Sequence, residues 1–482
     1  MGSDSLAVQK FALHPQPCAL PAVANLDTWY NLLAQSMAHI EPFRALRYDP
    51  GRVALAQVAT QPYDKITPEM QEGYYASSPH NLVRIILGKR GSSDHSGDNP
   101  YTRAAAYFCD WRRHGVLIQD AQPALYRYTQ QFPAPGGKGQ SERKGFIALG
   151  KVEDYAAGVV FRHEQTLAKP KADRLDLLRA TRAHFGQIFM LYSDPSAEIE
   201  NALACSEAPL MEMTDEYGVL HRVWGVSDPG IVASVRGKMR DKKLIIADGH
   251  HRYETALTYR NERRAAAPAA GRQATEERSA SASGKTLTPH ELVMMTFVNM
   301  DSPGLIILPT HRVVHSVPGF SMDSLRDGVS EFFSVEEADT SINAARATIM
   351  LREAAHTGTS LLAVGRDRVF LLSRPKAPAS AFGNLSLRQQ GLDVVHLHKL
   401  LLEGAVGISE DAIRNQQNVT YIRNAEEAMA LVRSGRADVA FLMNPARMSQ
   451  IRDIAFAGEV LPQKSTDFYP KLLSGLTIYA LE

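Results

Sequence analysis

The amino-acid sequence predicts an α/β protein of more than one domain, built on α+β mixed sheets. The chain has 482 residues, which is too long for one ordinary hydrophobic core. Helical and strand patterns alternate along most of it, which is typical of α/β and α+β proteins. Residues 242–257, KKLIIADGHHRYETAL, combine a short apolar strand, a glycine turn and the start of a helix. No internal repeat indicates a solenoid or a propeller.

The composition excludes several classes of protein. Apolar residues make up 44% of the chain and charged residues 22%, as in an ordinary soluble globular protein. The net charge of +1 gives no electrostatic reason to expect a nucleic acid or a membrane surface as partner. The three cysteines are scattered, which suits a reducing compartment, and no apolar run reaches about 18 residues. We therefore expect a cytoplasmic protein, and the oligomeric state stays open.

The individual elements follow from local patterns. Apolar runs and alternation predict strands at 188–192, 221–226, 244–247, 292–299 and 438–443. Helices are expected at 175–182, from Arg252 onward, and at 446–457. The spacing of residues 424–427 is that of a capping box, and Gly435 suits the end of the helix that the box would begin.

Three polar stretches predict loops. Residues 88–100 and 133–144 are rich in glycine and are typical of surface loops, and 262–286 is a low-complexity stretch that predicts a mobile insertion near the helix after residue 252. The Asp-His-Ser sequence at 94–96 lies in the first loop, where we expect no preorganised catalytic geometry. The pattern divides the chain into an N-terminal α/β region (1–144), a central domain with the glycine turn (145–315) and a C-terminal α/β domain (316–482).

The turn at 248–252 is the main candidate site. Strand, glycine turn and helix N-terminus together present backbone N–H groups and a positive dipole end to an anion. Gly249 permits a positive φ or a close approach of a ligand, and Arg252 can grip phosphate with two hydrogen bonds. His250 and His251 can transfer a proton near neutral pH, and Asp248 can ligate Mg²⁺. The structural alternative is a corner in which Asp248 caps the helix.

Further candidates lie in other blocks. Glu164 follows His163 in a sequence that lacks the second histidine of a zinc protease, so we interpret it as a general base or metal carboxylate. His311 and Arg312 follow an apolar run, a position where sites gather in α/β proteins. Lys464, Ser465 and Thr466 lie in a segment that departs from a P-loop but offers groups for an anion. The sequence contains neither the GxSxG elbow of a serine hydrolase nor the GxGxxG loop of a dinucleotide fold.

These blocks, taken together, resemble the prokaryotic family known as domain of unknown function 1015. The family's Pro-Tyr-Asp and Pro-His-Asn blocks are matched at 62–64 and 79–81. Its Gly-Phe-Ile-Ala, His-Glu-x-Thr, Asp-Gly-His-His-Arg and Pro-Thr-His-Arg blocks follow, and a C-terminal block closes the series. Those matches are 145–148, 163–166, 248–252, 309–312 and 462–471. They occur in order over about residues 40–478.

The Asp-Gly-His-x-Arg turn also looks like the phosphate-binding turn of the ParB/sulfiredoxin superfamily, which includes CTP-binding partition proteins and free-serine kinases. This resemblance implies a nucleotide-binding core with ATP or ADP, or else CTP, together with Mg²⁺. It leads us to expect a nucleotide-dependent phosphotransferase acting on a small hydroxylated molecule, such as a free amino acid. A nucleotide-binding switch with slow hydrolysis and a phosphoester hydrolase remain open alternatives.

The hypothesis assigns roles to particular residues. The catalytic candidates are Glu164, His250, His251 and Glu254. The candidate phosphate and nucleotide ligands are Asp248, Gly249, His250, Arg252, His311, Arg312, Lys464, Ser465 and Thr466. Asp248 is the candidate metal ligand.

Overall fold

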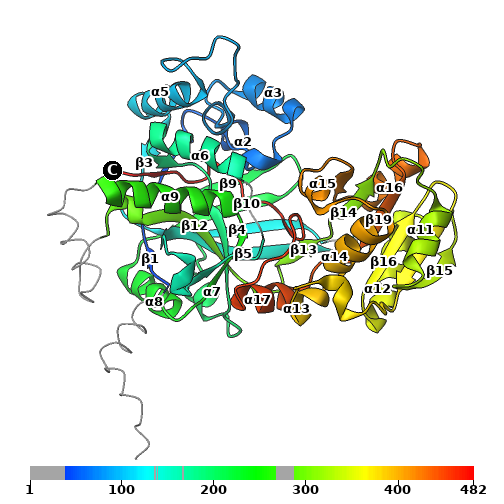
Figure 1. Ribbon diagram of the computed structural model, residues 1–482. Helices are drawn as coiled ribbons and strands as arrows, with labels where there is room; N and C mark the ends of the chain where they lie inside the picture. The colour runs from blue at the N-terminus through cyan, green and yellow to red at the C-terminus, as the bar shows by residue number, and fades with distance from the viewer. Residues whose placement is uncertain (1–37, 135–136, 138, 165–167, 267–286) are drawn as a thin grey trace, which may run out of the picture.

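Two β-sheets and the helices packed on them make up a mixed α/β structure, as the sequence predicts (Figure 1). The computed structural model describes residues 38–134, 137, 139–164, 168–266 and 287–482. The N-terminal helices lie at one end of the larger sheet, and the smaller sheet lies to its side.

The larger sheet has nine strands, in the order β6-β11-β8-β12-β5-β4-β10-β9, with β1 paired to β5. Its central strands β8, β11 and β12 are apolar over most of their length because both faces of the sheet are covered. Strands β8 and β12 are parallel, as are β6 and β11, and the other pairs are antiparallel. The bounds are β1 (Ile40–Glu41), β4 (Leu125–Pro133), β5 (Gln140–Lys151), β6 (Val160–Phe161), β8 (Ile188–Tyr192), β9 (Met211–Thr214), β10 (Leu220–Val226), β11 (Leu244–Asp248) and β12 (Leu292–Asn299).

The smaller sheet has six strands, in the order β15-β17-β16-β19-β14-β18, and all of its pairs are antiparallel. The bounds are β14 (His311–Val314), β15 (Ser334–Ala338), β16 (Ser360–Val364), β17 (Val369–Ser373), β18 (Val419–Ile422) and β19 (Val439–Met443). Three two-stranded pairs complete the sheet structure: β2 (Leu46–Tyr48) with β3 (Leu117–Gln119), β7 (Ala183–His184) with β21 (Tyr479–Ala480), and β13 (Ile306–Leu308) with β20 (Asp467–Tyr469).

Helices cover one face of each sheet. Apolar residues of α7, α8 and α9 share a buried cluster with one face of the nine-stranded sheet. Helices α12 and α16 pack in the same way on the six-stranded sheet. Helix α6 lies against α9, and α5 lies against α6. The bounds of this group are α5 (Pro100–Arg113), α6 (Ala168–Thr181), α7 (Glu198–Ala202), α8 (Pro229–Met239), α9 (His250–Ala266), α12 (Ala344–Ala354) and α16 (Ala425–Arg433).

The remaining helices have at most ten residues each. Most of them lie in the N-terminal region or between the six-stranded sheet and the rest of the molecule (Figure 1). The α-helices are α2 (Leu55–Val58), α3 (Pro68–Ser77), α4 (Val83–Ile86), α11 (Met322–Val329), α13 (Leu387–Gln390), α14 (Asp393–His396), α15 (Glu410–Arg414) and α17 (Met448–Phe456). The 3₁₀-helices are η1 (Tyr63–Lys65), η2 (Tyr155–Ala157), η3 (Pro289–Glu291), η4 (Ala355–Thr357) and η5 (Ala379–Phe382), and η6 (Leu397–Ala405) is a π-helix.

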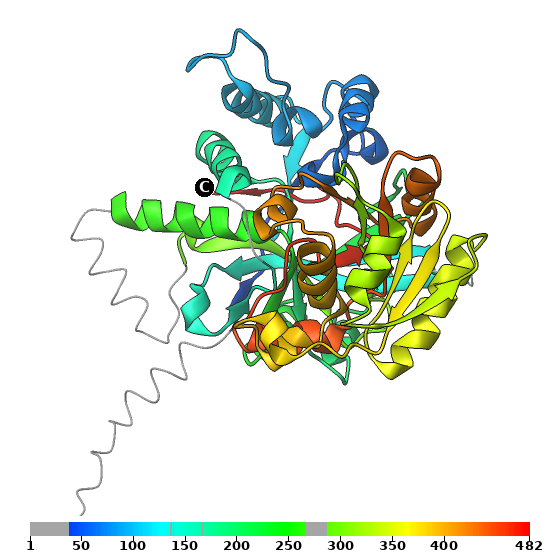
Figure 2. The ribbon, with the colours of Figure 1, turned by 45° about the vertical axis from the view of Figure 1, so that its right-hand side comes forward.

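The largest buried cluster joins the two sheets. It includes Phe189 and Ile245 of the nine-stranded sheet, Phe441 of the six-stranded sheet, and Leu401 of the π-helix between them. The end of the chain runs through the same cluster and then pairs with β7, so the C-terminal segment lies across both parts of the molecule (Figure 2). This packing places the glycine turn beside residues that are more than 200 positions away in the sequence.

Most sequence-predicted elements are present with small shifts of their ends. Strand β12 has the predicted bounds, and Asn424 caps α16 by accepting a hydrogen bond from the Glu427 N–H group. Helix α9 begins at His250, two residues earlier than predicted, so both histidines lie in its first turn. It continues to Ala266, and the rest of the predicted mobile insertion, up to residue 286, lies outside the described residues.

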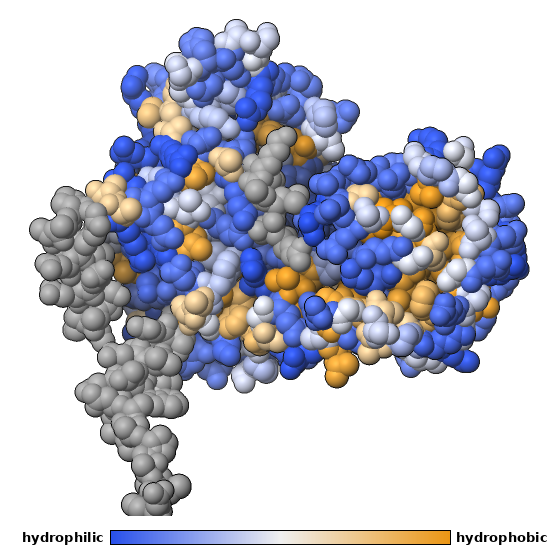
Figure 3. Space-filling view, in the orientation of Figure 1, coloured by the Kyte–Doolittle hydropathy of each residue, from blue (hydrophilic) through white to orange (hydrophobic). Residues whose placement is uncertain are grey.

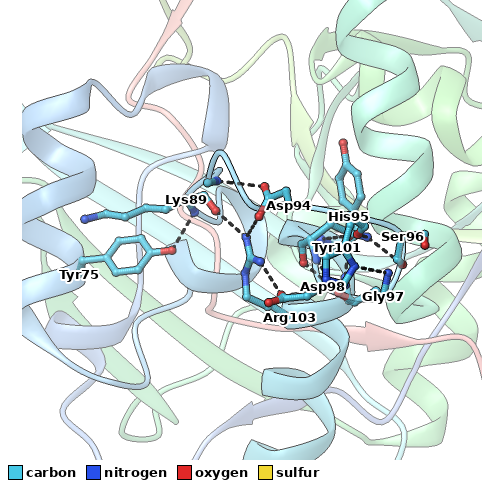
Figure 4. Close-up of polar contacts among 12 residues, drawn as sticks. Tyr75, Lys89, Asp94, His95, Ser96, Gly97, Asp98, Tyr101 and Arg103 are labelled. Atoms are coloured by element: carbon cyan, nitrogen blue, oxygen red, sulfur yellow. Dashed lines mark hydrogen bonds and ion pairs between the residues drawn. The ribbon is translucent and has the colours of Figure 1, made fainter.

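One loop prediction, that for residues 133–144, needs correction. Residues 140–144 belong to strand β5 because they pair with β4 in a long hairpin. The predicted domain boundary at residue 144 therefore falls inside a strand, and the predicted boundary at 315 falls just after β14, which belongs to the C-terminal sheet. The loop around Asp94 is ordered by hydrogen bonds: Arg103 binds both Asp94 and Asp98, and the Gly97 N–H group donates to His95 (Figure 4).

The surface differs between the two parts of the molecule. Hydrophilic side chains dominate the viewed face of the N-terminal helices, whereas apolar side chains gather on the C-terminal part (Figure 3). Among the residues that the structure describes, no helix is both long enough and apolar enough to cross a membrane.

Candidate functional site

The turn after β11 contains Gly249, around which polar side chains gather at the start of α9. These side chains are Asp248, His250, His251, Arg252 and Glu254. Gly249 has a φ of +89°, a conformation that residues with a Cβ atom rarely adopt. A Cβ atom at this position would also lie 3.0 Å from Nε of Arg252, whose guanidinium folds back over the glycine. Glycine is therefore required here both for the backbone conformation and for the packing of Arg252.

Asp248 is held by backbone and lysine contacts. Its Oδ1 atom accepts a hydrogen bond of 2.7 Å from the Gly249 N–H group, and its Oδ2 atom lies 3.1 Å from Nζ of Lys471. Lys471 also lies 2.9 Å from Asp467, and Arg423 forms an ion pair with Asp467. Burial would raise the pKa of Asp248, but the nearby cations, Lys471 foremost, hold that pKa well below its usual range. Asp248 is thus a carboxylate at every physiological pH.

Two more lysines approach this ion-pair cluster. Lys65, at the end of η1, is half-buried, and burial together with the charge of Lys471 lowers its pKa. Lys464 is exposed, has a φ of +57° and also contributes to lowering the pKa of Lys65. Within the described part of the chain, no carboxylate lies within ion-pair distance of either ammonium group. Positive charge is therefore gathered beside the N-terminus of α9.

A pair of buried histidines lies under the turn. His163 is fully buried, with Nδ1 2.7 Å from the Ile246 carbonyl oxygen and Nε2 2.8 Å from Oγ1 of Thr466. The His250 ring packs against it with a centroid distance of 4.9 Å, and Nε2 of His250 has no hydrogen-bond partner among the described residues. Burial lowers the pKa of both histidines, and for His250 the neighbouring His163 adds to the effect. Both rings are therefore neutral near pH 7.

The two candidate bases have different surroundings. Oε1 of Glu164 lies 2.9 Å from the Thr466 N–H group and 2.8 Å from the Thr466 hydroxyl, so it joins the segment after β6 to the C-terminal segment. Glu254 lies one turn into α9 and forms an ion pair with Lys171 of α6. His251 lies beside this pair, and burial lowers its pKa.

The Arg252 side chain extends over Gly249 toward Gln187. It donates to the carbonyl oxygen of Gln187, and one of its amino groups lies 3.8 Å from Asp248. Beside it is a cavity of about 60 Å³ with a mainly apolar lining that also includes Tyr63 and Arg174. The position of Arg252 suits a structural role in holding the turn, and it equally suits a contact with a ligand that enters through this cavity.

His311 and Arg312 lie on β14, in the six-stranded sheet. Nδ1 of His311 accepts a hydrogen bond of 3.3 Å from the Met443 N–H group. Arg312 is fully buried and donates to the carbonyl oxygens of Gln463 (3.4 Å) and Lys464 (3.2 Å). It therefore supports the backbone from which the Lys464 side chain extends, while the Ser465 hydroxyl donates to the Pro462 carbonyl oxygen at 2.6 Å.

The structure brings the separate blocks into one region. Glu164, Thr466 and His250 are joined through His163, and Asp248 is joined to the C-terminal block through Lys471. Sequence reasoning gave no role to Lys65, His163, Arg423 and Asp467. Lys65 and His163 lie in or next to blocks that carry the family resemblance, so their positions were signalled but their chemistry was not.

A metal ion at Asp248 would find few protein ligands. No group of three or more His, Cys, Asp or Glu side chains suited to a metal ion occurs in the described ranges. Asp248 already accepts two hydrogen bonds, so a Mg²⁺ ion at this carboxylate would take most of its ligands from phosphate oxygens and water, as Mg²⁺ commonly does.

Comparison with known proteins gives a family and remote structural neighbours. No curated protein matches the chain. The solved structures include a conserved hypothetical protein from Pyrococcus furiosus, with 10% identity, a TM-score of 0.32 and coverage of 67% of this chain and 92% of the other. A free serine kinase in complex with AMP shows 11% identity, a TM-score of 0.31 and coverage of 66% and 89%. SbnI from Staphylococcus aureus, with a C-terminal truncation, shows 9% identity, a TM-score of 0.31 and coverage of 68% and 85%.

The comparison with family models identifies a family. The family described as "Protein of unknown function (DUF1015)" matches residues 40–395, nearly three quarters of the chain, including the Asp248–Arg252 turn and the Pro-Thr-His-Arg block. The chain therefore belongs to the DUF1015 family.

Proposed function

We propose that the protein is a nucleotide-dependent phosphotransferase that phosphorylates a small hydroxylated molecule, such as free serine or another hydroxylated amino acid. The observation that carries the proposal is the set of ammonium groups beside the N-terminus of α9. Lys65 and Lys464 have no carboxylate within ion-pair distance in the described chain, and Asp248 and Asp467 act on Lys65 from farther away. The helix dipole adds positive potential at the same place. A polyphosphate would neutralise this charge.

The neighbouring groups can serve the transfer step. In the proposed reaction the substrate hydroxyl oxygen attacks the terminal phosphorus of ATP or ADP, the bond to the leaving nucleotide breaks, and the hydroxyl proton passes to a carboxylate. Glu164 and Glu254 are the two candidate bases. Lys65, Lys464 and the turn N–H groups would stabilise the charge on the phosphoryl oxygens, and Mg²⁺ at Asp248 would add to this effect.

A nucleotide panel tests the proposal. ATP, ADP and CTP, each with and without Mg²⁺, should raise the melting temperature in proportion to their binding, and turnover is then measured with pooled hydroxylated amino acids and hydroxy acids. Lys65→Met should weaken nucleotide binding by about tenfold to 100-fold, the order expected for losing a hydrogen bond to a charged group. Lys376→Met, at an exposed lysine of the C-terminal part, is the matched control and should bind normally.

The outcomes separate the alternatives. Binding with phosphoryl transfer to a hydroxylated acceptor supports the kinase. Binding with slow release of phosphate and no acceptor indicates a nucleotide switch, and hydrolysis of phosphoesters without nucleotide binding indicates a hydrolase. If no nucleotide changes the melting temperature, the phosphotransferase proposal is wrong. Arg252→Ala should remove the shift in a folded protein, whereas an unfolded variant would assign Arg252 to the structure alone.

A further inference from the structure

A second pocket lies in the C-terminal part of the molecule, on the side that faces the glycine turn. Its volume is about 180 Å³. The π-helix η6, the short helix α15, strand β18 and the segment 460–463 form its walls. The same π-helix and α15 contribute to the buried cluster that joins the two sheets, and Figure 1 shows α14 and α15 on the side of the six-stranded sheet that faces the nine-stranded sheet.

The lining is apolar with a polar group that has no partner. Leu385, Val395, Ile413 and Val460 line the pocket with aliphatic side chains, and Tyr421 supplies an aromatic ring. His398 lines the pocket and is 8% exposed, yet its Nε2 atom has no hydrogen-bond partner within the described chain. A buried imidazole nitrogen without a partner is costly unless something fills that position.

The charged residues at this pocket neutralise one another. Lys399 lies 2.9 Å from Glu403 and 3.2 Å from Glu410, and Arg414 lies 2.9 Å from Glu410. These four side chains therefore add no net charge to the pocket, and another nearby charge is that of the buried Arg312, which adds to the lowering of the His398 pKa by burial. The Arg312 guanidinium lies 4.9 Å from the centroid of the Tyr421 ring and covers one of its faces. An uncharged, flat and partly aromatic group with hydrogen-bonding edges fits the lining, because Tyr421 borders the pocket with its remaining surface and the unpartnered nitrogen of His398 belongs to the same wall.

The pocket is next to the proposed phosphate site along the chain. Pro462 and Gln463 line it, and Lys464 follows directly. The charge of Lys464 contributes to lowering the pKa of both Lys65 and His251, so its ammonium group lies near the turn. The π-helix η6 also forms part of the pocket wall. Its hydrogen bonds join residues five positions apart, as when the Val406 N–H group donates to the Leu401 carbonyl oxygen at 2.8 Å, and such turns are frequent at functional sites.

We propose that this pocket holds the nucleoside part of the nucleotide whose phosphates lie at Lys464, Lys65 and the Asp248–Arg252 turn. This inference rests on the proposed function and extends it from phosphate binding to recognition of the base. The base lies against Tyr421 with an edge toward His398, and the ribose leads past Gln463 to the phosphates.

Binding measurements with ATP and with tripolyphosphate separate the two parts of the site. Val460→Trp fills the pocket and should weaken ATP binding at least about tenfold, the order of a lost base–aromatic stacking contact, while tripolyphosphate binding stays unchanged. Lys65→Met should weaken the binding of both ATP and tripolyphosphate. Ile349→Trp, at an exposed isoleucine of α12, is the control for adding an indole and should bind both normally.

Labelling of the unaltered protein gives a second test that does not depend on a variant folding. An azidoadenine derivative of ATP, photolysed on the full chain, should label residues 395–421 or 460–463, as mapped by mass spectrometry. Labelling elsewhere, or normal ATP affinity in a folded Val460→Trp protein, overturns the nucleoside pocket while the phosphate site stands. If neither ATP nor tripolyphosphate binds the unaltered protein, the proposed function fails and the pocket assignment fails with it.

Discussion

At the scale of single residues, the glycine turn shows how one position can serve both backbone and side chain. Gly249 supplies the positive φ that ends β11 and begins α9, and its missing side chain leaves space for the Arg252 guanidinium. Sequence pattern alone predicted this turn, because a glycine between an apolar run and a helical pattern marks a change of backbone direction. It could not predict that Arg252 folds back over the glycine.

Gly249→Ala should therefore destabilise the protein. A residue with a Cβ atom at this φ costs about 1–3 kcal/mol, and displacing Arg252 adds to the cost. Gly237→Ala, in α8, is the matched control, since no atom lies within 4 Å of the added Cβ and an alanine in a helix is favourable by about 0.5–1 kcal/mol. Urea unfolding monitored by circular dichroism measures both. Equal stability of the Gly249→Ala protein and the parent would refute this account of the turn.

Buried histidines predict how stability changes with pH. Burial, with the charge of Arg312, lowers the pKa of His311 to about 4, whereas an unfolded histidine titrates near 6.5. Between pH 6.5 and pH 4 the unfolded chain therefore binds more protons than the folded one. The free energy of unfolding is highest, as far as His311 is concerned, above about pH 6.5 and falls as the pH drops toward 4. His163 and His250 act in the same direction.

His311→Gln should make the protein less sensitive to acid. Below pH 6.5 the loss of unfolding free energy should be smaller by up to about 1.4 kcal/mol per pH unit, the contribution of one histidine that stays neutral. Unfolding in urea at pH 5 and pH 7.5 gives this difference. The exposed His356, changed to Gln, should leave the difference as it is in the parent. An unchanged pH dependence in His311→Gln would show that other groups dominate.

At the scale of elements, the segment 462–471 depends on partners from elsewhere in the chain. Arg312 of β14 binds its carbonyl oxygens, Glu164 binds Thr466, and Lys471 binds Asp248. The sequence indicated an anion site in this segment from its lysines and hydroxyl groups. It could not indicate that Arg312 holds the backbone rather than pointing to solvent, because that depends on β14 packing beside the segment.

Arg312→Lys tests this supporting role. A lysine keeps the charge but cannot reach several carbonyl oxygens at once, so the unfolding free energy should fall by about 1.5–3 kcal/mol. Nucleotide affinity, measured by calorimetry, should fall less than in Lys464→Met. Arg366→Lys, at an exposed arginine, should have little effect on either quantity. A greater loss of affinity in Arg312→Lys than in Lys464→Met would instead mean that Arg312 contacts the phosphates.

At the scale of the whole molecule, one core joins the two sheets. Phe468 of β20 is 1% exposed and packs edge-on against Phe189 of the nine-stranded sheet and His163. Strand β20 pairs with β13, and β13 comes directly before β14, the first strand of the six-stranded sheet along the chain. The site therefore lies where both parts of the molecule contribute residues, and its geometry depends on this shared core.

This core predicts cooperative unfolding. Trp111 of α5 and Trp224 of β10 both precede the six-stranded sheet in the sequence, so their fluorescence reports on the first part, whereas circular dichroism reports on both parts. The two signals should change together in urea, and Phe468→Ala should lower the unfolding free energy in both by about 3–5 kcal/mol. Phe332→Ala, at a partly buried phenylalanine of the C-terminal part, should cost less. Separate transitions in the parent would show that the two sheets unfold independently.

The sequence by itself determined the fold class, the approximate positions of five strands (β8, β10, β11, β12 and β19), the glycine turn and the family, because these depend on short-range patterns of hydrophobicity, turn residues and motifs. The tertiary structure decided which charges meet. Asp248 and Lys471 are 223 residues apart, and Glu164 and Thr466 are 302 apart, so no local pattern connects them. Ion pairs and burial depend on how the sheets pack, and within the described chain that packing leaves Lys65 and Lys464 beside the turn without a carboxylate at ion-pair distance, although Asp248 and Asp467 lie near enough to offset part of the lowering of the Lys65 pKa by burial.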